Sequence, residues 1–94
     1  MIDLSSIRNP AVEFLGLSVT VSAIRCQIAG ISSAYAGLFG IIVGVNAESG
    51  ECLVSLDEAS HRRFLEIENA AFSEGLRDNS EDQWFCSGVL EAVA

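Results

Sequence analysis

The sequence has no lysine, and its five basic residues are all arginines. Against them stand thirteen acidic residues, so the formal net charge is −8 at pH 7. Eleven of the thirteen acids lie in residues 47–94, while residues 1–46 carry two acids and two arginines. A chain without a basic stripe is repelled by phosphate, so we expect no nucleic-acid binding. We interpret the nearly uncharged first half as core and interface, and the acidic second half as the solvated side.

Residues with a chemistry of their own are few and scattered. Cys26, Cys52 and Cys86 include no closely spaced pair, and His61 is the only histidine. Structural zinc sites take ligands in pairs about two to four residues apart, so we expect no metal site and no cofactor. A catalytic histidine needs an orienting carboxylate and a nucleophile, and nothing in the sequence pairs a serine or cysteine with His61. We therefore expect a protein that is not an enzyme.

The sequence also lacks the marks of export. The first residues have no basic region followed by an apolar run, so we expect no secretory signal. An odd number of cysteines suits a reducing compartment, and we expect a cytoplasmic protein. Residues 28–45 contain no charge and reach the lower limit of a membrane span. Because no basic residue follows this run, we expect no membrane contact, and a small membrane protein is only the last alternative.

Apolar residues make up half of the sequence, and only 19% of residues are charged, against about 25% in a typical domain. We expect residues 1–94 to form a single domain, which at this size buries only about 60–65% of the surface that its unfolded chain exposes. Part of the apolar excess must therefore reach the surface, where it favours a protein partner or self-association. We expect a homo-oligomer.

Alternation of apolar and polar residues predicts strands. It is clearest in residues 17–24, where the pattern can continue to residue 28. The strongest segments, 38–46 and 51–57, are joined by a turn at Gly50 and predict a hairpin. In the first of them Phe39, Ile41, Val43 and Val45 share one face and Leu38, Gly40, Ile42 and Gly44 the other, and in the second Cys52, Val54 and Leu56 point inward.

The remaining segments give helical and mixed signals. Residues 9–16 predict a short helix that Asn9 can cap and Pro10 can begin. Residues 57–75 fit either a full helix or a loop followed by a short strand and a helical turn. Residues 83–93 predict a closing strand.

The stretch from Ala36 to Asp57 resembles the KOW-type hairpin of SH3-like barrels. A turn of small residues is followed by a glycine-containing apolar strand, a short turn and a second strand that ends in an acidic residue. Residues 17–24 would supply the preceding strand and residues 64–67 the next one, so the resemblance covers residues 17–67. The positions that fit the hairpin are Gly37, Gly40, Ile42, Gly50, Val54, Leu56 and Asp57.

Families with this pattern include ribosomal proteins, transcription elongation factors and small subunits of multi-component enzymes. The basic residues of their nucleic-acid-binding members are missing here, so the resemblance implies a protein–protein role. We predict a mainly β fold, a small SH3-like open barrel with short helical segments. The alternative is an α+β fold with a helix over residues 57–75 on a four-stranded sheet.

The predicted function is a non-catalytic protein-binding or assembly module. The alternative is a small-molecule-binding protein or an accessory subunit of a multi-component enzyme, with a pocket at the mouth of the barrel. The candidate interaction or pocket residues are Tyr35, Leu38, Phe39, His61 and Trp84.

Overall fold

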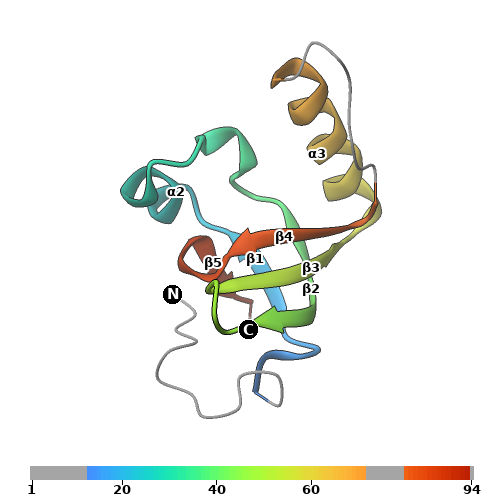
Figure 1. The fold of residues 1–94 in the computed structure, drawn as a ribbon. Helices are drawn as coiled ribbons and strands as arrows, with labels where there is room; N and C mark the ends of the chain where they lie inside the picture. Colours follow the sequence, from blue (N-terminus) through green and yellow to red (C-terminus); the bar gives the residue numbers. More distant parts are fainter. Residues whose placement is uncertain (1–12, 72–79, 94) are drawn as a thin grey trace.

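The longest strand lies at the centre of the sheet in this protein. The computed structural model describes residues 13–71 and 80–93, and in this part of the chain five antiparallel strands form one sheet in the order β4-β3-β2-β1-β5 (Figure 1). Strands dominate, and two helices, α2 (Ala23–Ala29) and α3 (Glu58–Ala71), accompany the sheet. The strands are β1 (Ser18–Val21), β2 (Phe39–Asn46), β3 (Glu51–Leu56), β4 (Asp82–Cys86) and β5 (Leu90–Ala92).

The predicted hairpin is confirmed as β2 and β3. The turn between them places Gly50 at φ +74°, a left-handed conformation that glycine adopts without strain. The side-chain oxygen of Asn46 closes the turn by accepting hydrogen bonds from the backbone N–H groups of Glu48 and Ser49. The inward side chains of β3 are the predicted ones, since Cys52, Val54 and Leu56 are all buried.

A β-bulge divides β2. The register of its pairing with β3 shifts between Ile42 and Gly44. Up to that point the expected alternation is present, with Ile42 buried and Ile41 exposed. The extra residue at the bulge inverts the alternation. Val45 therefore packs partly buried against the core, and its predicted place on the face of Ile41 and Val43 was wrong.

The segment after β1 also departs from the prediction. The strand ends at Val21 instead of continuing toward residue 28, and α2 (Ala23–Ala29) follows. The Ser22 side chain caps this helix by accepting a hydrogen bond from the N–H of Arg25, and Gly30 ends it at φ +73°. A capping serine and a terminal glycine are strong helix boundaries, and here they override the alternating pattern. A 3-10 turn, η1 (Ser33–Tyr35), then leads to β2.

The ambiguous segment 57–75 contains the helix α3 (Glu58–Ala71). Asp57 caps it, because its carboxylate oxygen accepts a 2.7 Å hydrogen bond from the backbone N–H three residues later. The helical alternative is therefore right over these residues, and a strand at residues 64–67 is wrong. The sheet beside it has five strands instead of the four of that alternative, and the end of the segment lies outside the described residues.

The predicted closing strand is two strands. β4 ends at Cys86, the 3-10 turn η2 (Ser87–Val89) follows, and β5 pairs with β1 at the opposite edge of the sheet. The link from Cys86 to Leu90 spans at most about 14 Å, whereas the outer strands of a flat five-stranded sheet would lie about 19 Å apart. The sheet must therefore curl, and Figure 1 shows the chain crossing between its edges at this turn.

The core lies inside the curl and draws on both helices and on every strand except β4, whose partly buried Phe85 packs against it. At the N-terminal side residues 13 and 14 are helical as predicted, while residues 9–12 of that helix lie outside the described part. The uncharged run 28–45 is divided among α2, η1 and β2, and no helix within the described residues is long and apolar enough to cross a bilayer. The buried apolar core consists of Val19, Val21, Cys26, Leu38, Ile42, Cys52, Val54, Leu56, Phe64, Val89 and Leu90.

Gly40→Ala should lower the free energy of unfolding by about 2–3 kcal/mol, because added volume at a closed contact forces the backbone apart. A Cβ here would collide with the Ser55 carbonyl oxygen and lie 2.7 Å from Val54 Cγ1. Urea unfolding followed by circular dichroism measures the change. Gly88→Ala is the control, since its Cβ would make an ordinary 3.6 Å contact with Cys86 Sγ and should change stability by less than about 0.5 kcal/mol. Equal stability of the two variants would contradict this reading of the strand contact.

Candidate functional site

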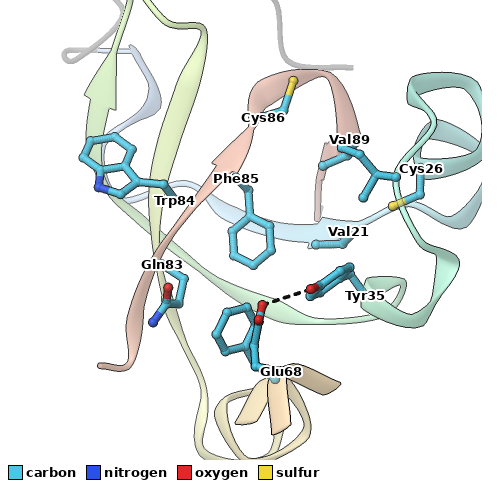
Figure 2. A pocket seen from close by; sticks show the side chains of 11 residues that line it. Val21, Cys26, Tyr35, Glu68, Gln83, Trp84, Phe85, Cys86 and Val89 are labelled. Atoms are coloured by element: carbon cyan, nitrogen blue, oxygen red, sulfur yellow. Dashed lines mark hydrogen bonds between the residues drawn. The ribbon is translucent and has the colours of Figure 1, made fainter. Parts of the chain in front are cut away.

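A pocket of about 270 Å³ opens between the helices and strand β4. Figure 2 shows side chains from β1, α2, η1, α3, β4 and η2 around it, so elements far apart in the sequence meet there. Most of its wall is apolar, which suits a small ligand that buries a hydrocarbon or aromatic body. The apolar lining includes Val21, Ile31, Phe64, Phe85 and Val89.

Aromatic contacts fix α3 against the floor of this pocket. The Phe64 ring lies 6.1 Å from the ring of Tyr35 and 6.2 Å from that of Phe85, the second contact in an edge-to-face arrangement. Such ring pairs are favourable beyond the area they bury. Over residues 58–69, Phe64 is the one apolar side chain of α3 that is buried. The position of the helix therefore depends on this ring.

The polar end of the pocket is a hydrogen-bonded pair. The Tyr35 hydroxyl donates a 2.9 Å hydrogen bond to Oε1 of Glu68 (Figure 2). Burial, the hydrogen bond to Glu68 and the charge of that carboxylate together raise the pKa of Tyr35 to about 12. The phenol thus remains protonated at neutral pH and holds the carboxylate in place. It links η1 to α3 at a distance of 33 residues in the sequence.

In the described part of the chain, the arginine side chains make their contacts with groups other than Glu68. No arginine there forms an ion pair with this carboxylate. A half-buried carboxylate without a cationic partner favours a cation as its ligand. The three arginines within residues 13–71 point elsewhere, with Arg25 pairing with Glu91, Arg62 pairing with Glu58, and Arg63 donating to the Ala34 carbonyl.

The cysteines are free thiols, and two of them are buried. Burial raises the pKa of Cys26, and burial together with the nearby Cys86 raises that of Cys52. A thiol with a raised pKa is a poor nucleophile at neutral pH. Among the residues that the structure describes, no three His, Cys, Asp or Glu side chains converge as they would around a metal ion.

The predicted candidate residues are divided among several places. Tyr35 and Trp84 line the pocket, although the Trp84 ring points away from Phe85 and Tyr35 in Figure 2 and is 49% exposed. Leu38 is in the core at 1% exposed. Phe39, on β2, donates its backbone N–H to Ser60 Oγ of α3, and neither it nor the half-buried His61 lines the pocket.

Sequence reasoning missed Phe64 and Glu68, the two residues through which α3 reaches the pocket. They are four residues apart and so share a face of a helix. That spacing could have singled them out had the helical alternative been followed. Their contact with Tyr35 has no local signal in the sequence.

A second surface feature is the outer face of strands β2, β3 and β4. Leu53 lies opposite Gly44 on one side and Trp84 on the other, so these residues share a face of the sheet. Ile41, Val43 and Trp84 are 44%, 45% and 49% exposed. We call the cluster of Ile41, Val43, Leu53 and Trp84 the outer apolar face.

The chain matches no protein-family model, no curated protein and no solved structure. Its function is therefore argued from the pocket and the outer apolar face.

Tyr35 should titrate with a midpoint near pH 12 in the folded protein, and near 10 in denaturant. It is the only tyrosine, so phenolate absorbance reports it directly, and far-UV circular dichroism at each pH verifies the fold. Because the folded pKa is the higher one, the folded state binds more protons between these values. The contribution of Tyr35 to stability is therefore complete below pH 10 and lost as the pH rises toward 12.

Glu68→Gln should move the folded midpoint part of the way toward 10, because the charge of the carboxylate is removed while burial remains. A midpoint near 10 in folded wild-type protein, or no change in the variant, would contradict the assignment.

Proposed function

We propose that this protein is a non-catalytic protein-binding module, and that its outer apolar face docks a partner with an apolar centre and a basic rim. The observation that carries the proposal is the exposure of Ile41 and Val43 on β2 and of Trp84 on β4, the two strands that flank β3. Single exposed apolar residues are ordinary, but a contiguous cluster of large ones usually marks an interaction site. Tryptophan in particular is enriched among the residues that dominate binding energy.

The charges around this face define the partner. Glu51 and Asp82 lie on the same side of the sheet, opposite Cys86 and Ser55 respectively. The arginines of the described residues lie outside β2, β3 and β4, since these strands carry none. Acidic rims steer and select basic partners. A second copy of the chain would bring like charges together at this face, which disfavours it as the partner. Because the sequence predicts self-association, a second copy is the competing occupant of the face.

We further propose that the fold is an SH3-like barrel with a KOW-type hairpin. The strand order, the bulged β2–β3 hairpin and the 3-10 turn between β4 and β5 support this assignment. Open sheets of this kind present loops and one sheet face to partners. The three free cysteines suit a reducing compartment, and we place the protein in the cytoplasm as part of the same proposal.

Peptides selected from a random displayed library against the whole protein should combine aromatic or aliphatic residues with lysine or arginine. Trp84 is the only tryptophan, so its emission should shift to the blue when a selected peptide covers the outer apolar face. The double variant Ile41→Ser, Val43→Ser should weaken peptide binding by at least about tenfold, the loss expected for removing central apolar contacts.

The control is Ile24→Ser, Ile28→Ser on α2, which removes two side chains that are 70% and 75% exposed but lie outside the outer apolar face. It should bind the peptides as the wild type does. Equal weakening of the two double variants, or selection of neutral or acidic peptides, would overturn the proposal. Sedimentation equilibrium tests the competing occupant. A dimer that the Ile41→Ser, Val43→Ser variant abolishes would assign the face to a second copy and remove the basic partner.

A further inference from the structure

We infer that the pocket between α3 and β4 binds a small organic cation with an apolar body, such as an arylalkylamine. The inference rests on other side chains than those of the outer apolar face, apart from Trp84, which also lines the pocket. Gln83 and Phe85 of β4 face the pocket, and the burial pattern of β4 alternates along its five residues.

The carboxylate of Glu68 selects the charge. One of its oxygens accepts the hydrogen bond of Tyr35, and a carboxylate has acceptor positions for further donors. An ammonium group carries up to three N–H donors and would complete this coordination. A carboxylate or phosphate ligand would meet the same negative charge and be repelled. The net charge of −8 raises the local concentration of cations in the same direction.

The apolar side chains that line the pocket determine which uncharged part of a ligand fits there. Tyr35, Phe64 and Phe85 present ring surfaces, and Ile31 and Val89 add aliphatic surface. Aromatic surfaces also attract a cation placed over or beside them. The volume of about 270 Å³ lies near the lower limit of ligand pockets, which begin at about 300 Å³. A single aromatic ring with a short amine chain suits this size, whereas a nucleotide or a dinucleotide cofactor does not.

Three probes of nearly equal shape test the inference: phenethylamine, phenethyl alcohol and phenylacetate. Each is titrated into the full chain, and binding is followed by NMR shifts of the Ile31 and Val89 methyl groups. Phenethylamine should bind at least about tenfold more tightly than the alcohol, since a partly buried charge pair outweighs a neutral hydrogen bond. Phenylacetate should bind least. Equal binding of the amine and the alcohol, or no shift with the amine at millimolar concentration, would overturn the inference.

Glu68→Gln should abolish the preference for the amine while keeping the shape of the side chain. Glu66→Gln is the charge-matched control, because Glu66 is on the same helix but exposed to solvent and outside the pocket lining. It should retain the preference. Equal loss in the two variants would show that only the overall charge matters and would refute a site at Glu68. The Ile41→Ser, Val43→Ser variant should bind phenethylamine normally, so failure of one proposal is distinguishable from failure of the other.

Discussion

The close approach of β2 to β3 at Gly40 is the constraint on which the sheet depends. No side-chain atom fits there, because the Ser55 carbonyl and the Val54 side chain occupy the space. Two residues further on, the bulge bends the same strand. The resulting curl brings the outer edges close enough for η2 to connect them. It also gives the sheet two unlike faces, one closed around the core and one that leaves large apolar side chains in solvent.

The helices occupy the open side of this curl, and they are attached at a few points. α3 is held by the Phe64 ring, by the Ser60 hydroxyl that accepts from the Phe39 backbone, and by the pair of Tyr35 and Glu68. A helix with one buried apolar residue over most of its length cannot seal the opening by packing. The pocket is the space that these sparse contacts leave, and its single carboxylate lies there because the helix turns that face inward.

The sequence predicts features whose signals lie within one segment, and it does not predict features that depend on contacts between distant segments. Alternation and the glycine turn sufficed for the β2–β3 hairpin, because both signals lie within the segment itself. At Val45 alternation failed, because a bulge depends on how two strands fit together. After Val21 the alternating pattern predicted more strand, but a helix forms there because a serine caps its start and a glycine ends it. Both of these residues were visible in the sequence. The pocket could be found only in part. Tyr35 and Trp84 were chosen by residue type, whereas Glu68 required knowledge of a contact across 33 residues.

Strand β4 shows how the two proposed surfaces can coexist in so small a chain. Its alternation turns Phe85 toward the pocket and the Trp84 ring outward, so neighbouring residues serve opposite sides (Figure 2). Both surfaces carry acidic groups, and in the described part of the chain neither has an arginine paired with those groups. The absence of lysine therefore has one physical consequence at both surfaces. Among the residues that the structure describes, no arginine pairs with Glu68 or Asp82, and both proposals rest on these unmatched charges.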